Sequence, residues 1–425
     1  MNTTTTTIGN WSDVNITTPI DVGLNVTSGG GSAGGGARFL PWDNPRNIIS
    51  QKLSDDIAEV CECYLFPILT VAGVVGNICS LIVLMQKKLR NSTTSIILIG
   101  LAYSDALFLV TNSVRESSCI IDRFDPLLAD VISATTFYYM HYLKTAFSRT
   151  STILVVLISV ERVIAVGFPL KARIWITKPK IIIAVVACYI TSFAILAGYP
   201  PQYTYVYYGD KPFIAYTQFA LDNADSLKVY NNYILPISLR HVPVILVFSL
   251  NTAIIVLLRR SKRFQMSSAS QDAKRNDELK KVTRMLLTVA IVYLICLLPG
   301  DIFLRCAIEI PDFQFYRAYH NLFLAVSDIC LLFEMFNSCI NFVIYMVLNR
   351  NFYDVYVRLF CCYVPFIRDR MSTLTSRSST SNSRKTKETS VTENPGGSAE
   401  ISESRLANIA EGGHMNKGLD PIPSA

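Results

Sequence analysis

The chain has 425 residues, of which 51% are hydrophobic and 17% are charged. Soluble domains usually contain about 25% charged residues, so this composition excludes a set of soluble domains and indicates a membrane protein. The net charge of +7 does not indicate a nucleic-acid partner, because the basic residues gather in alternate loops between apolar segments.

Residues 1–58 are polar, with a threonine run and a glycine-rich stretch. Such a composition cannot bury a core, which predicts a flexible tail. Four Asn-x-Ser/Thr sequences, which are useful only in the secretory lumen, begin at Asn2, Asn10, Asn15 and Asn25. We therefore predict an extracellular glycosylated tail. No cleavable signal peptide is expected before residue 60, so the first apolar segment is predicted to act as a signal anchor.

Seven apolar segments follow, and each is long enough for a membrane-spanning helix, which needs about 17–25 residues. They cover residues 60–86, 95–118, 131–166, 180–200, 232–258, 282–306 and 318–348. The loops after the first, third and fifth segments are rich in Lys and Arg, which places the N-terminus outside and the C-terminus in the cytosol. The sequence therefore predicts an all-α membrane protein with a seven-transmembrane helix bundle over residues 59–349.

Residues 350–362 form an amphipathic stretch and predict a short eighth helix at the inner leaflet. It ends in Cys361 and Cys362, which are predicted palmitoylation sites. Unmodified cysteines are the alternative. Residues 363–425 are polar and rich in Ser and Thr, which predicts a disordered cytoplasmic tail. Phosphorylation of this tail by a receptor kinase would add charge and recruit arrestin, and plain disorder is again the alternative.

Charged side chains inside the apolar segments are candidate functional sites, because a charge within a membrane is costly. The third segment ends in Glu161 and Arg162, whose alternative role is a salt bridge that only marks the membrane edge. Asp105 lies well inside the second segment and needs a partner. A small cation such as sodium could bind an oxygen-rich set at matching depth, formed by Asp105, Ser151, Asn337, Ser338 and Asn341. A protonated Asp105 hydrogen-bonded to Asn341 is the alternative.

These residues, in this order, resemble the motifs of class A, rhodopsin-like G-protein-coupled receptors over nearly the whole membrane region. The resemblance rests on short motifs that together are specific. They are Gly76-Asn77 in the first helix, Leu101-Ala102-Tyr103-Ser104-Asp105 in the second, Glu161-Arg162-Val163 in the third, Pro243 in the fifth, Cys296-Leu297-Leu298-Pro299 in the sixth and Asn341-Phe342-Val343-Ile344-Tyr345 in the seventh.

The resemblance implies a conformational switch that couples an outside ligand to a heterotrimeric G protein. It implies that Arg162, released from Glu161, contacts the G protein, and that Leu170 docks in an apolar pocket of that partner. The remaining residues of the implied switch are Asn251, Tyr293, Asn341 and Tyr345. An allosteric sodium ion at Asp105 is the one candidate for a bound cofactor.

Several positions depart from the family pattern. Phe137 stands where the third helix usually carries a cysteine, and the loop from Pro201 to Leu235 has no cysteine, so the usual disulfide is absent. These departures resemble invertebrate FMRFamide- and sex-peptide-type neuropeptide receptors, and also vertebrate orphan receptors for aromatic amino acids. A non-standard disulfide could form near the outer face among Cys61, Cys63, Cys119 and Cys306, and its connectivity cannot be derived from the sequence.

The expected ligand site is unusually charged. By position in their helices, six residues should face it or its rim: Arg115, Glu116, Lys144, Arg240, His241 and Glu334. Lys144 stands where aminergic receptors carry an aspartate, which disfavours a monoamine. Glu334 could pair with an arginine or amine of the ligand, or internally with Lys144 or Arg115. Tyrosines suited either to an aromatic peptide end or to a β-hairpin cap stand at Tyr203, Tyr205, Tyr207 and Tyr208.

We therefore expect a plasma-membrane receptor for an extracellular neuropeptide that activates heterotrimeric G proteins. A small aromatic or amino-acid-like ligand is the alternative. A transporter is a distant alternative, because no internal repeat is visible. Retinal attachment needs a lysine in the seventh helix, and none occurs between Arg317 and Asn349. The four histidines have no metal-ligand spacing, so an enzyme is not expected.

Overall fold

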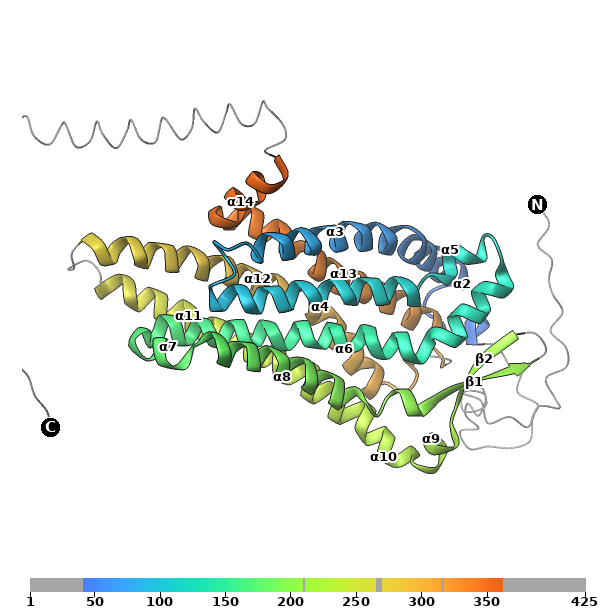
Figure 1. The fold of residues 1–425 in the computed structure, drawn as a ribbon. Coiled ribbons are helices and arrows are strands. Elements are labelled where there is room, and N and C mark those ends of the chain that lie inside the picture. The colour runs from blue at the N-terminus through green and yellow to red at the C-terminus, as the bar shows by residue number, and fades with distance from the viewer. Residues whose placement is uncertain (1–40, 209–210, 265–269, 315–316, 362–425) are drawn as a thin grey trace, which may run out of the picture. The chain divides into compact units, whose positions relative to one another are not determined.

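The computed structural model describes residues 41–208, 211–264, 270–314 and 317–361 (Figure 1). The four predicted glycosylation sites, Asn2, Asn10, Asn15 and Asn25, lie outside these residues. So do Cys362 and the predicted cytoplasmic tail, 363–425, with its phosphorylation candidates. Cys361 is the last residue described.

Seven helical segments within the described chain are long and apolar enough to cross a membrane. They are Gln51–Leu84, Thr93–Asp122, Tyr139–Gly167, Lys178–Gln202, Ala224–Arg259, Lys281–Glu309 and His320–Leu348. Each overlaps one predicted apolar segment. The prediction of an all-α, seven-transmembrane bundle is therefore confirmed.

The first spanning segment begins before the predicted boundary at residue 59. It joins α2 (Gln51–Ala58), the π-helical turn η3 (Glu59–Leu65) and α3 (Phe66–Leu84). Ser50 caps α2 by accepting a hydrogen bond from the backbone N–H of Leu53, and the Ser54 hydroxyl donates to the backbone carbonyl of Asn321. These polar contacts hold residues that composition alone assigned to a flexible tail.

The second and third spanning segments lie at the centre of the bundle. Helix α4 (Thr93–Arg115) packs against α3, α8 (Lys178–Leu196), α13 (His320–Leu348) and α6 (Pro126–Gly167). Helix α6 has 42 residues and starts ahead of the predicted apolar segment, because Asp125 caps it and Pro126 suits its first turn.

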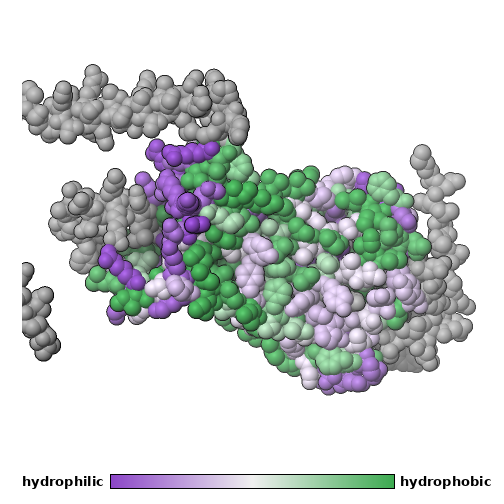
Figure 2. Space-filling view, in the orientation of Figure 1, coloured by the Kyte–Doolittle hydropathy of each residue, from purple (hydrophilic) through white to green (hydrophobic). Residues whose placement is uncertain are grey.

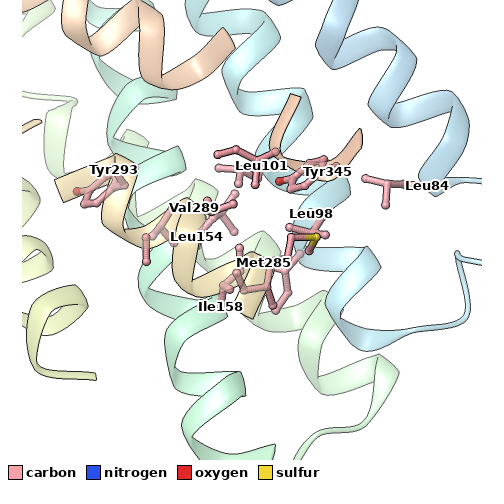
Figure 3. Close-up of a cluster of buried hydrophobic side chains, with 14 of the residues drawn as sticks. Leu84, Leu98, Leu101, Leu154, Ile158, Met285, Val289, Tyr293 and Tyr345 are labelled. Atoms are coloured by element: carbon pink, nitrogen blue, oxygen red, sulfur yellow. The ribbon is translucent and has the colours of Figure 1, made fainter. Parts of the chain in front are cut away.

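The fifth and sixth spanning segments complete the bundle beside α6. The fifth comprises α10 (Ala224–Val229), the π-helical turns η5 (Tyr230–Ile234) and η6 (Ile237–His241), and α11 (Val242–Phe264). The sixth is α12 (Ser270–Glu309), which contains Pro299. Buried apolar side chains from α4, α6, α12 and α13 form the largest core cluster, which includes Leu98, Leu154 and Val289 (Figure 3).

Shorter elements lie at the two ends of the bundle (Figure 1). One end carries α5 (Ser118–Asp122), α9 (Gln218–Asp222) and the hairpin of β1 (Tyr203–Tyr208) and β2 (Lys211–Tyr216). We call it the hairpin end. The other end carries α7 (Pro169–Trp175) and α14 (Arg350–Tyr356), which continues into η8 (Val357–Cys361) and agrees with the predicted eighth helix. We call it the α14 end.

Apolar side chains on the outer surface face away from the core, as expected for helices in contact with lipid. Helix α8 exposes Ile182, Ile183, Val186 and Ile190 on one face. Figure 2 shows hydrophobic side chains over much of the visible face, with a strongly hydrophilic band towards the α14 end.

Candidate functional site

The Glu161–Arg162 pair lies at the α14 end of α6 and is buried, with only 3% and 5% of the two residues exposed. The Arg162 Nε and Nη2 atoms lie 2.9 and 2.6 Å from Oε2 of Glu161. Glu161 also accepts hydrogen bonds from the hydroxyls of Thr93 and Thr94 at the start of α4, and Arg162 is hydrogen-bonded to Thr94. The pair is thus enclosed by two helices instead of standing exposed at a membrane edge.

Leu170 lies close by in sequence, on α7, and is 83% exposed. A large apolar side chain that is solvated at a polar end of the molecule is free to enter a partner's apolar pocket. The docking role that the resemblance implies for Leu170 stays a prediction.

Three donors converge on the carboxylate of Asp105 in the middle of α4. The Ser151 and Ser338 hydroxyls lie 2.7 and 3.1 Å from Oδ1, and the Asn341 amide donates to Oδ2 over 2.8 Å. Asn337, the fifth member of the predicted set, makes none of these contacts. The described residues hold no group of three His, Cys, Asp or Glu that could hold a metal ion, so a cation here would rely on one carboxylate with hydroxyl and amide oxygens.

The other predicted switch residues lie buried in the core of the bundle. Asn251 of α11 donates to the Ser159 hydroxyl of α6, over 3.1 Å. The hydroxyls of Tyr293 and Tyr345 are buried without a hydrogen-bond partner within the described chain, and Figure 3 places both in the apolar cluster. Buried unpaired hydroxyls are costly, so a second packing that pairs them would be stabilised.

Two groups of charged side chains lie nearer the hairpin end. We define the Glu116 cluster as Glu62, Arg115, Glu116, Lys144 and Asp328. Within it, Nζ of Lys144 lies 2.9 Å from Oε1 of Glu116, and Nη1 of Arg115 lies 3.6 Å from Oε2. Glu62 and Asp328 lie within electrostatic range of Glu116 and Lys144. Three predicted ligand-site residues are thereby brought together.

We define the Glu334 cluster as Arg149, Arg240, Asp301 and Glu334, from α6, η6, α12 and α13. Arg149 Nη2 lies 2.9 and 3.2 Å from the two carboxylate oxygens of Glu334. Arg240 Nη2 lies 3.1 Å from Oε1 of Glu334, and Arg240 Nε lies 2.5 Å from Oδ1 of Asp301. The cluster thus joins four helical elements through alternating charges.

The internal partners predicted for Glu334 were therefore wrong. Glu334 pairs with Arg149 and Arg240, whereas Lys144 and Arg115 pair with Glu116. Sequence reasoning missed Arg149 and Asp301, although each is a charge inside an apolar segment and so carried the signal used for Asp105. His241, also predicted for the ligand site, joins neither cluster.

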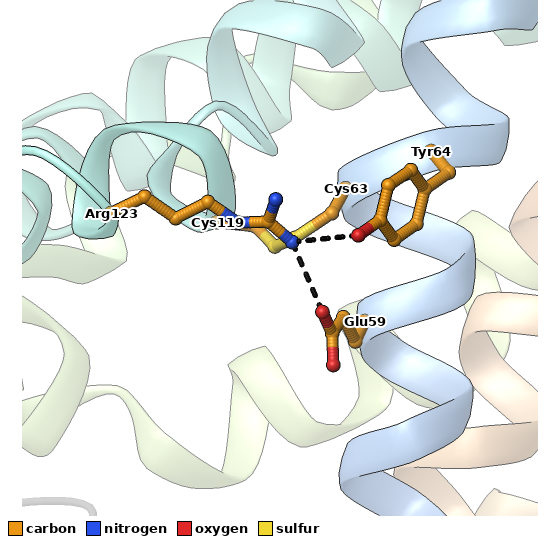
Figure 4. Close-up of a disulfide and its surroundings, with 5 residues drawn as sticks. All are labelled: Glu59, Cys63, Tyr64, Cys119 and Arg123. Carbon is orange, nitrogen blue, oxygen red and sulfur yellow. Dashed lines mark hydrogen bonds and ion pairs between the residues drawn. A yellow bond between two sulfur atoms is a disulfide. The ribbon is translucent and has the colours of Figure 1, made fainter. Parts of the chain in front are cut away.

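One cysteine pair from the four outer candidates is bonded. Cys63 in η3 and Cys119 in α5 form a disulfide across a sequence separation of 56 (Figure 4). Cys61 and Cys306 are free. Arg123 lies beside the disulfide and donates to the Tyr64 hydroxyl and to Glu59, which ties α5 further to the first helix.

The tyrosine-rich loop forms a hairpin, so the hairpin-cap alternative describes its structure. Tyr203 of β1 packs edge-on against Phe137 of α6, with ring centroids 5.7 Å apart, and against Tyr199 and Tyr216. Burial raises the pKa of the Tyr203 hydroxyl. Phe137 therefore makes an aromatic contact with this loop at the position where related receptors carry a cysteine.

Seven spanning helices, with a buried acid–arginine pair at one end and charged clusters towards the other, define a seven-transmembrane receptor. Residues 62–363 match the family described as serpentine type 7TM GPCR chemoreceptor Srw, and the chain belongs to this family. A relative from Caenorhabditis elegans, named probable G-protein coupled receptor B0563.6, is 23% identical over 339 residues. The match covers 75% of this chain and 73% of the relative.

The protein is therefore a multi-pass membrane receptor of the G-protein-coupled type, and the prediction that it is not an enzyme is confirmed. The family implies an extracellular ligand and coupling to a G protein. Assignment to the neuropeptide or aromatic-amino-acid receptors stays a prediction.

Proposed function

We propose that the receptor binds an extracellular peptide through the hairpin end and activates a heterotrimeric G protein through the α14 end. The observation that carries this proposal is the pair of charged clusters inside the half of the bundle nearer the hairpin. A peptide supplies the charged and hydrogen-bonding groups that such side chains recognise, and a largely apolar ligand does not. The partly exposed rings of Tyr205 and Tyr207 would offer contacts to aromatic residues of the peptide.

The orientation in the plasma membrane follows from charge. Loops at the α14 end are richer in Lys and Arg than loops at the hairpin end, which favours the cytosolic side for the α14 end. The hairpin and the predicted glycans at Asn2, Asn10, Asn15 and Asn25 would then be outside. Palmitoylation at Cys361 and Cys362, and arrestin and receptor kinase acting on the tail, fit the same orientation and stay predictions.

Binding would act by shifting an equilibrium between two packings of the bundle. A change from mostly inactive to mostly active requires about 5.5 kcal/mol of differential affinity. In the active packing Arg162 would leave Glu161 and contact the G protein, together with Leu170. The buried hydroxyls of Tyr293 and Tyr345 would gain partners in that packing.

The test is a screen of synthetic neuropeptides, including FMRFamide- and sex-peptide-type sequences, against cells that express the receptor, with calcium and cAMP readouts. Free tryptophan and phenylalanine belong in the same screen, because activation by them alone would favour the small-ligand alternative. Arg162→Ala should abolish agonist-driven activation at equal surface expression. Arg305→Ala, which removes an exposed arginine near the opposite end, is the control. Full signalling by Arg162→Ala would contradict the proposed coupling.

A further inference from the structure

Arg149 has one hydrogen-bonding group that the protein does not satisfy. Its side chain is only 6% exposed, and Nη2 makes both contacts to Glu334. Nη1 is buried and has no hydrogen-bond partner in the described part of the chain. A buried donor without an acceptor destabilises the folded protein, so an acceptor from outside the protein would stabilise this atom.

The neighbouring carboxylates are already engaged. Glu334 accepts from Arg149, from Arg240 and from the Ser148 hydroxyl, and Asp301 accepts from Arg240. Arg240 also packs closely against Gly300, because a Cβ at Gly300 would lie 2.7 Å from its Nη2. Tyr293 lies within electrostatic range of Arg149, but no hydrogen bond joins the two side chains. Nη1 of Arg149 therefore remains a donor without an acceptor in the described chain.

The net charge of the Glu334 cluster indicates which kind of acceptor suits Nη1 of Arg149. Two arginines face two carboxylates, so the cluster is balanced before anything binds. A third carboxylate would add an uncompensated charge inside the membrane, which is costly. A carbonyl or carboxamide oxygen accepts the same hydrogen bond without adding charge.

We propose that Arg149 binds an uncharged carbonyl or carboxamide oxygen of the extracellular ligand, donating from Nη1. This inference rests on the proposed peptide ligand and narrows it to one that presents a neutral oxygen at this depth. Lys144, five residues earlier on α6, lies about 7.5 Å nearer the hairpin end at 1.5 Å per residue. The ligand must therefore reach beyond the Glu116 cluster.

The test uses two probes that differ in one group, N-acetyltyrosinamide and N-acetyltyrosine. Their affinities are measured on the purified full-length receptor from the rise in thermal unfolding midpoint with probe concentration. We expect the amide to bind at least about tenfold more tightly than the acid. The amide oxygen makes a charge-assisted hydrogen bond with Arg149, whereas the acid also adds a negative charge to a balanced cluster. Equal affinities, tighter binding of the acid, or no stabilisation by either probe would overturn the proposal.

Arg149→Lys tests the residue itself, because lysine keeps the charge facing Glu334 but removes Nη1. The ratio of amide to acid affinity should fall towards one, and a general loss of stability would not produce that change. Arg123→Lys at the surface is the matched control and should keep the wild-type ratio. If Arg149→Lys does not fold, the ratio of amide to acid affinity on the wild-type receptor still tests the proposal.

Failure of this inference is distinguishable from failure of the proposed function. If the peptide screen yields agonists while both probes bind equally, the peptide proposal stands and the role of Arg149 is wrong. If the amide preference depends on Arg149 but no peptide activates signalling, the acceptor site stands and the peptide assignment is wrong.

Discussion

Replacing Glu334 by glutamine should destabilise the receptor more than its single lost charge suggests. Glu334 is the common counter-ion of Arg149 and Arg240, whose side chains are 6% and 16% exposed. Glutamine keeps the shape but offers one acceptor oxygen in place of two. Its amide nitrogen is a donor, so it cannot accept the arginine hydrogen bonds that the second carboxylate oxygen accepts.

The magnitude follows from burial. Removing one partner of a buried ion pair typically costs about 3–5 kcal/mol, because a charge remains without compensation. Here Arg240 keeps Asp301, whereas Arg149 loses the one ion-pair partner that it has in the described chain. We therefore expect a loss near the lower figure, about 3 kcal/mol, in the free energy of unfolding.

The assay is thermal unfolding of purified wild-type and variant receptor under identical detergent conditions. Glu309→Gln is the control, because Glu309 pairs with Arg305 in an exposed i,i+4 bridge worth at most about 1 kcal/mol. Adding Arg149→Gln to Glu334→Gln should recover part of the loss, since the uncompensated charge is then removed. If Glu334→Gln unfolds at the same temperature as Glu309→Gln, the cluster does not stabilise the bundle and our reasoning is refuted.

Three further predictions concern other contacts. Cys63→Ser should lower unfolding stability by about 4 kcal/mol from loop closure, and a reducing agent should add no further loss; an unchanged midpoint would contradict this. Phe137→Ala should speed hydrogen exchange in the hairpin relative to the wild type and leave exchange at the α14 end unaltered. If the variant changes exchange equally in both regions, the contact of Phe137 with Tyr203 does not hold the hairpin. Asp105→Asn should remove any dependence of agonist affinity on sodium relative to choline, and a persisting dependence would exclude this carboxylate as the ion site.

The helices could be predicted because a bilayer imposes their length and composition. Asp105 was likewise predictable, since a carboxylate in an apolar segment must find donors, and Ser151, Ser338 and Asn341 supply them. The early start of the first helix could not be predicted by composition. It depends on tertiary contacts of Ser54 and on the cap at Ser50, which apolar content does not reveal.

The ion-pair partners of the buried charged residues could not be predicted from the sequence, for a different reason. Which acid meets which base depends on helix rotation and on the reach of each side chain, and neither is written in the hydropathy pattern. Gly300 illustrates this dependence, because the absence of a side chain lets Arg240 approach Glu334. The charge of Arg149 was nevertheless visible in the third apolar segment.

Two contacts near the hairpin end replace the disulfide that the third helix lacks. The Cys63–Cys119 bond fixes the first helix to α5 covalently. The hairpin is held to α6 by non-covalent contacts such as that of Phe137 with Tyr203, and an aromatic pair adds only about 0.5–1.5 kcal/mol beyond the area that it buries. Local opening at that cost is readily populated. A ligand that must pass the hairpin to reach Arg149 therefore has a route that does not require any covalent bond to break.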